Sequence, residues 1–158
     1  MLLAAFKWIQ ATELAVAINN SSYAFAISEC FHLIALAVIG GAVLIVDARL
    51  LGYGFRRQSV ADVAAAARPW LIGSLVLIVV TGYLMFSSLA ADKYYWNVGF
   101  RWKMALLAAA IAFTFLVRQP YALRSGTTGG TPVAWAVAAV SIGLWLGVAV
   151  MGRAIGFL

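Results

Sequence analysis

Long apolar runs separated by short polar segments dominate the hydrophobic pattern of this chain. The runs cover residues 24–51, 70–90, 100–117 and 133–155. Each holds roughly 18 or more mostly apolar residues, which is the length that an α-helix needs to cross a hydrocarbon core of about 30 Å. Pro69 and Pro132 stand where the second and fourth helices should begin, and Pro120 should end the third. The pattern predicts an all-α integral membrane protein in which residues 21–158 form a four-helix bundle.

The first 20 residues have a different pattern. Lys7, Gln10, Glu13 and Asn20 recur near helical spacing among leucine, phenylalanine, tryptophan and isoleucine. This pattern is typical of an amphipathic helix that lies in the membrane interface, so residues 1–20 are predicted to form one. A cleaved signal peptide is the competing interpretation, but Glu13 interrupts the apolar stretch that such a peptide needs.

Composition supports the membrane assignment. Hydrophobic residues make up 65% of the chain, charged residues 10%, and the mean hydropathy is +1.00. A soluble domain carries about 25% charged residues, so a soluble class is excluded. The net charge of +6 comes from basic residues between the apolar runs, which indicates a role in membrane topology rather than nucleic-acid binding.

The distribution of arginine predicts the orientation of the bundle. The connection between the first two spans contains several arginines: Arg49, Arg56, Arg57 and Arg68. Arg118 and Arg124 are assigned to the connection between the third and fourth spans, on the same side. Because short loops rich in arginine stay in the cytoplasm, both termini are predicted to lie outside.

Charged residues at apolar depth form a predicted buried polar cluster. Glu29 and Asp47 are 18 positions apart, about five helical turns, and His32 falls within roughly 60° of the same stripe. The four-helix topology places Lys103 and Arg153 at the depth of Glu29, where either could supply its counter-charge. Such a cluster is either a functional site or a structural ion pair that fixes helix register.

Sulfur and imidazole side chains suggest a second kind of site. Cys30, His32, Met85, Met104 and Met151 share one half of the predicted bundle, and their chemistry suits Cu(I). Cys30 is turned about 200° from His32 on a helix, so the candidate site consists of His32 with the three methionines. Packing is the alternative, since methionine often fills gaps in apolar cores.

Haem is the other cofactor considered. Glu29-x-x-His32 occurs once, and this is the only histidine, which excludes a di-iron site or bis-histidine haem within one chain. Haem b could be held by His32 from two subunits, or by His32 and a methionine. No phosphate loop, zinc motif or nucleophile–base pair is present, so a non-catalytic protein without its own cofactor is favoured, with haem or copper as the alternative.

Several short motifs resemble a family of small bacterial four-helix membrane proteins that is known only as a domain of unknown function. They are Glu29-x-x-His32, the segment 47–52, Pro69-Trp70, Thr81-Gly82, Lys103 and Gly152-Arg153-x-Ile155. The chain is more distantly similar to CopD-type copper-resistance membrane domains, although one histidine falls short of the ligands expected there. The resemblance implies a bacterial inner-membrane location.

Small residues in the last span indicate close helix packing. Gly143-x-x-x-Gly147 and Gly152-x-x-x-Gly156 have the spacing that lets transmembrane helices approach each other. The expected partners are therefore the lipid bilayer and other membrane subunits or further copies of the chain, and not nucleic acid. The sequence favours an accessory or structural subunit of an oligomer or larger inner-membrane complex.

Overall fold

The computed structural model describes residues 2–21, 23–54, 57–126 and 129–157. Within these ranges the chain is helical and contains no strand. The elements, in chain order, are α1 (Leu2–Gln10), α2 (Glu13–Asn20), α3 (Ala24–Leu50), α4 (Val60–Ser88), the π-helical turn η1 (Ala90–Tyr94), α5 (Val98–Phe113), the π-helical turn η2 (Thr114–Arg118), α6 (Gln119–Arg124) and α7 (Pro132–Ala154).

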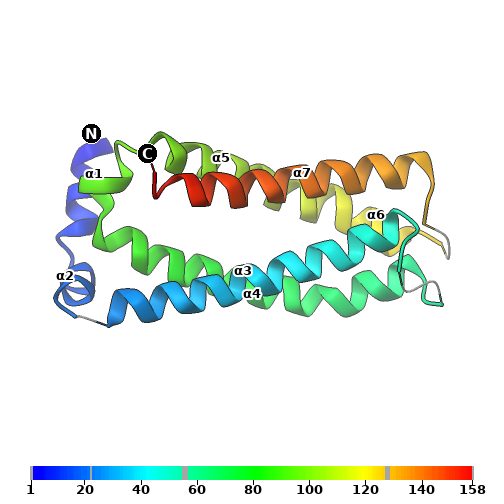
Figure 1. Ribbon diagram of the computed structural model, residues 1–158, viewed down its shortest axis with the longest axis horizontal. Helices are drawn as coiled ribbons and strands as arrows, with labels where there is room; N and C mark the ends of the chain where they lie inside the picture. The colour runs from blue at the N-terminus through cyan, green and yellow to red at the C-terminus, as the bar shows by residue number, and fades with distance from the viewer. Residues whose placement is uncertain (1, 22, 55–56, 127–128, 158) are drawn as a thin grey trace.

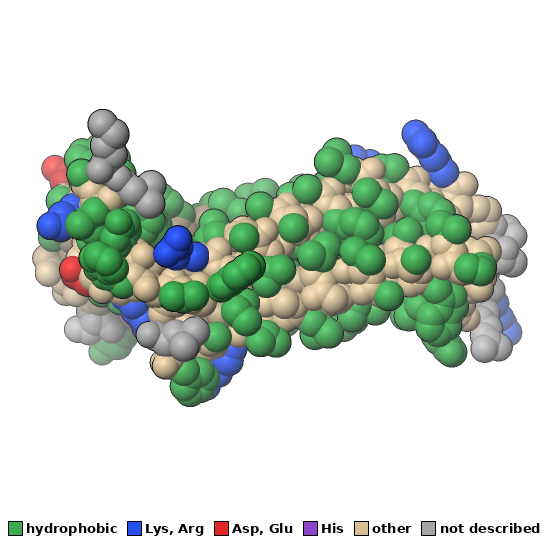
Figure 2. Space-filling model, turned by 90° about the horizontal axis from the view of Figure 1, so that it is seen from above, with side chains coloured by type: hydrophobic (Ala, Val, Ile, Leu, Met, Phe, Trp, Pro, Cys, Tyr) green, Lys and Arg blue, Asp and Glu red, His purple; other side chains and the backbone are tan. Residues whose placement is uncertain are grey.

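Among the described residues, four helical segments are long and apolar enough to cross a membrane. They are Ala24–Leu50, Val60–Ser88, Val98–Arg124 and Pro132–Ala154. At most a third of the most apolar window of each is buried inside the protein, so most of these side chains face outwards. Figure 2 shows hydrophobic side chains along the length of the molecule and charged ones mainly towards its ends. The prediction of an all-α membrane bundle with four spans is confirmed.

Two proline-based boundaries were wrong. α4 begins at Val60, where Ser59 and Asp62 form a capping box, and Pro69 lies inside the helix. The third span does not end before Pro120 but continues through η2 and α6 to Arg124. Pro120 occupies the first turn of α6, where its missing N–H is tolerated. Residues 118–124 therefore belong to the span and not to a loop.

The four spans form two helix pairs (Figure 1). α3 packs along α4, and α5 packs along α7. Both termini lie at one end of the molecule, with the α4–α5 connection, whereas the α3–α4 and α6–α7 connections lie at the other end. Consecutive spans therefore run antiparallel, and the two pairs are joined through α3 with α7 and through α4 with α6, the continuation of the α5 span.

The N-terminal segment is two helices rather than the single one predicted. α1 ends at Gln10, and α2 starts at Glu13 after Thr12, whose hydroxyl caps it by accepting a bond from the Ala15 amide. Side-chain bonds attach α1 to η1 and α2 to the end of α4: Gln10 accepts from the Ala91 amide at 2.7 Å, and Asn19 donates to the Ser88 carbonyl at 2.8 Å. The pair therefore covers the end of the bundle that holds the termini (Figure 1).

Candidate functional site

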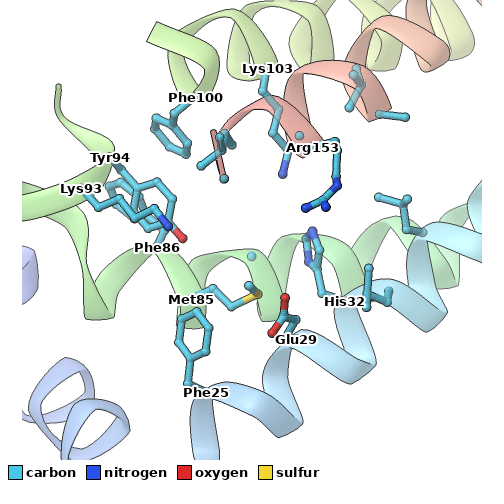
Figure 3. A pocket seen from close by; sticks show the side chains of 18 residues that line it. Phe25, Glu29, His32, Met85, Phe86, Lys93, Tyr94, Phe100, Lys103 and Arg153 are labelled. Carbon is cyan, nitrogen blue, oxygen red and sulfur yellow. The ribbon is translucent and has the colours of Figure 1, made fainter. Parts of the chain in front are cut away.

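A cavity of about 400 Å³ lies between the two helix pairs, towards the end that holds the termini. Residues of α3, α4, η1, α5 and α7, and of the turn after α7, line it (Figure 3). Its ionisable or charged side chains are Glu29, His32, Lys93, Tyr94, Lys103 and Arg153. We call this space the polar cavity. Four of the five residues of the predicted polar cluster line it, although they come from three different helices.

His32 is held in one orientation by the neighbouring helix α4. Its Nδ1 lies 2.9 Å from the Thr81 hydroxyl, which itself donates to the Leu77 carbonyl at 2.7 Å. Since that hydroxyl proton is already used, Nδ1 must donate to Thr81. In the neutral ring, Nε2 is therefore an acceptor. Gly82 makes room for the ring, because a Cβ there would lie 3.2 Å from His32 Cε1.

Two cations face the cavity from the α5–α7 side. Lys103 runs beside Gly152, where a Cβ would lie 3.7 Å from its Nζ. The Arg153 guanidinium lies over the ring of Phe157, with Cζ 4.7 Å from the ring centroid. Among the described residues, neither side chain makes a hydrogen bond or an ion pair within 4.0 Å. Their charges are therefore available to a ligand.

Glu29 lies across the cavity from these cations, on α3 (Figure 3). The expected bond from Glu29 to Lys103 or Arg153 is not formed: in the described part of the chain its carboxylate has no ion-pair partner within 4.0 Å. With Lys93 at the rim, the lining carries three cations and one carboxylate. The lining therefore has a formal excess of two positive charges when its two lysines, arginine and glutamate are ionised and His32 is neutral.

Aromatic rings form the wall near the α4–α5 connection. Phe86 stacks on Phe100 with ring centroids 5.4 Å apart, and Tyr94 meets Phe100 at 5.0 Å. Burial raises the pKa of the Tyr94 phenol, and the negative charge of Glu29 raises it further. Tyr94 therefore stays protonated at neutral pH and offers a hydroxyl donor beside apolar ring faces.

Asp47 does not belong to the polar cavity. It is fully buried further along α3, where it accepts bonds from Arg118 Nε at 2.5 Å and from the Ser141 hydroxyl at 2.7 Å. Arg118 also donates to the Val43 carbonyl at 2.7 Å, while its Nη1 is buried without a partner. This centre ties α3, η2 and α7 together. The prediction that Asp47 shares one polar cluster with Glu29, His32, Lys103 and Arg153 was wrong, because Asp47 lies in a separate centre.

The sequence does not predict Arg118 at membrane depth when Pro120 is taken as the end of the third span. Arg118 was assigned to a loop, yet its side chain is completely buried. The apolar stretch continues up to Val117 immediately before it, and a proline in the first turn of a new helix is compatible with an unbroken span. An apolar stretch that runs up to Val117, followed by a proline that a first helical turn accepts, therefore indicates that Arg118 can lie within the span.

The predicted metal ligands are only partly brought together. His32 and Met85 line the polar cavity, whereas Met104 and Met151 do not. Met104 is instead exposed on the outer surface of α5. Within the described ranges, no group of three or more histidine, cysteine, aspartate or glutamate side chains could hold a metal ion. The four side chains considered as candidate metal ligands, His32, Met85, Met104 and Met151, therefore do not line one cavity.

The fold defines the class of the protein: a small multi-pass membrane protein with four apolar spans and a charged cavity between two helix pairs. A family model for a family of unknown function (DUF6644) matches residues 5–158, so the chain belongs to that family. Neither the curated proteins nor the solved structures contain a match.

Proposed function

We propose that this chain is a non-catalytic membrane protein that binds an anionic small molecule in the polar cavity. The observation that carries the proposal is the excess of positive charge among lining residues that form no ion pairs with one another. Lys103 and Arg153 supply this charge on one side of the cavity, and Phe86 and Phe100 supply apolar surface nearby.

The physical reason is the cost of unpaired charge within a span, which applies most to the half-buried Lys103, since Arg153 is exposed and lies in the last turn of α7. A cation inside a span is expensive unless a partner or water compensates it, and such residues usually mark ligand or ion sites. An anionic ligand between Lys103 and Arg153 would provide the missing counter-charge through charge-assisted hydrogen bonds. The aromatic wall would take the apolar part of the same molecule, as is usual in small-molecule pockets.

Benzoate is a suitable probe because it combines one carboxylate with a flat apolar ring. We expect the detergent-solubilised protein to bind benzoate in titration calorimetry. Lys103→Met and Arg153→Met should each weaken binding by about tenfold or more, because each removes one hydrogen bond to a charged group. Arg101→Met is the matched control: Arg101 lies on α5 like Lys103, but it is exposed and does not line the cavity.

Binding that Arg101→Met weakens as much as Lys103→Met would show a general attraction to a basic protein and would refute the proposed site. Thermal unfolding of each variant checks that the bundle is intact. A loss of binding in a variant that unfolds at the wild-type temperature would support a direct contact.

Haem is the second candidate because His32 and Met85, an imidazole and a thioether, line the same cavity. A protein that binds haem through these ligands would show a Soret band that is lost in His32→Ala. A copper site would give near-stoichiometric metal with the same dependence. Either result in the purified native protein would replace the anion-binding proposal.

We further propose that the protein acts as an accessory subunit in a bacterial inner membrane, with the α3–α4 connection in the cytoplasm. The arginines of that connection favour this orientation. Arg56 lies outside the described residues, so Arg57→Cys, Arg124→Cys and Lys93→Cys in a Cys30→Ala background are the test. We expect an impermeant thiol reagent, added to intact cells, to label only residue 93; labelling of 57 or 124 instead would reverse the orientation.

A further inference from the structure

A second, smaller cavity continues from the polar cavity towards the middle of the bundle. Its volume is about 150 Å³. The two spaces share several lining residues: His32, Leu36, Lys103, Val148 and Ala149. Apart from His32 and Lys103 at this junction, the described residues that line the smaller space are apolar, and the one indole N–H among them, that of Trp145, donates to the Thr114 hydroxyl at 3.1 Å. We call it the apolar cavity.

We propose that the two cavities together bind a single-chain anionic amphiphile, a carboxylate of the fatty-acid type. Its carboxylate would lie between Lys103 and Arg153, and its hydrocarbon chain would enter the apolar cavity. This inference rests on the proposed function and specifies the ligand class for the same site. The polarity of the two spaces determines the orientation, since a carboxylate could not be compensated among aliphatic side chains.

The dimensions favour a slender chain. Trp145 lines the apolar cavity and Arg153 lines the polar cavity, eight residues later on α7, a separation of about 12 Å along the helix axis. A dry apolar cavity near 150 Å³ accommodates a group of about the size of benzene. The space therefore suits one hydrocarbon chain and not the two chains of a phospholipid.

Two adjacent glycines offer a matched pair of variants. Gly40 lines the apolar cavity, while Gly41 lines none of the cavities described here. A Cβ at either position would meet no atom within 4 Å outside the local helix backbone. Gly40→Leu should therefore attach its side chain without a clash at Cβ and occupy the apolar cavity, and Gly41→Leu should add the same side chain outside it.

The test uses ω-bromodecanoate, whose terminal bromine quenches tryptophan fluorescence at short range. In the wild type and in Gly41→Leu, we expect a saturable quenching component at stoichiometric ligand. Trp145→Phe should remove this component, because Trp145 is the indole that lines the apolar cavity. Gly40→Leu should raise the bromodecanoate concentration at the midpoint of the saturable quenching about tenfold, or abolish this quenching. Saturable quenching that is unchanged in Gly40→Leu would overturn the inference.

Benzoate separates the two proposals because it is compact enough for the polar cavity alone. We expect Gly40→Leu and Gly41→Leu to bind benzoate as the wild type does. If benzoate binds but bromodecanoate quenching is unchanged in both Gly40→Leu and Trp145→Phe, the apolar cavity does not bind the hydrocarbon chain. The proposal that the polar cavity binds an anion would then still hold. If neither benzoate nor bromodecanoate binds, both the proposed anion site and the proposed amphiphile site are refuted.

Discussion

Replacing Asp47 by leucine is expected to destabilise the protein by about 3–5 kcal/mol, the usual cost of removing one partner of a buried ion pair. The change leaves Arg118 fully buried without its carboxylate. An arginine cannot release its proton in a protein, so the charge stays. The hydroxyl of Ser141 would also lose its acceptor.

Arg118→Met should be less harmful than Asp47→Leu. The carboxylate that remains can be neutralised by taking up a proton, whereas the guanidinium cannot. The double variant Asp47→Leu/Arg118→Met should be more stable than Asp47→Leu alone, because apolar pairs often replace buried ion pairs at little cost. Equilibrium unfolding in mixed micelles measures the free energy of unfolding of the two single variants and of the double variant. Additive losses, with the double variant the least stable, would contradict the account of this centre.

Gly129→Ala is expected to cost about 3 kcal/mol, at the upper end for an overpacked site. A Cβ at Gly129 would lie 2.2 Å from the Arg49 carbonyl oxygen and 2.9 Å from the Leu50 carbonyl oxygen. Both atoms belong to the backbone, so a change of side-chain rotamer cannot relieve the clash. The loop would have to move and would strain the bond from the Gly130 amide to the Leu50 carbonyl, now 2.8 Å.

Gly126→Ala is the matched control in the same loop, since a Cβ there would meet nothing within 4 Å. We expect the melting temperature of Gly126→Ala to equal that of the wild type and that of Gly129→Ala to fall clearly. Equal melting temperatures for the two variants would show that the close approach of residue 129 to the end of α3 does not stabilise the bundle.

The spans could be predicted because membrane helices carry their signal in composition and length. Their limits could not, since a proline is compatible with both a helix start and a helix interior when neighbouring groups compensate the lost bond. Pro69 lies within α4 and Pro120 in the first turn of α6. The break between α1 and α2 was also missed, because polar spacing continues across Thr12.

The candidate site was partly predictable for a geometric reason. Helical rise gives the depth of a residue, and depth placed Glu29, Lys103 and Arg153 in the same half of the bundle. Depth does not give the distance across a bundle, so the absence of a direct ion pair could not be foreseen. The pairing of Asp47 with Arg118 depends on residues 71 positions apart and on the π-helical turn that carries Arg118. Neither a contact between residues so far apart nor a π-helical turn can be recognised in a single sequence.

Thermal unfolding of the detergent-solubilised protein with benzoate and with its uncharged analogue benzamide, at matched ionic strength, tests the central claim most directly. A ligand that binds only the folded state raises the melting temperature in a saturable way. We predict such a rise with benzoate, no rise with benzamide, and a smaller rise in Lys103→Met than in Arg101→Met. Equal stabilisation by benzamide, or none by benzoate, would contradict the claim that the polar cavity binds an anion.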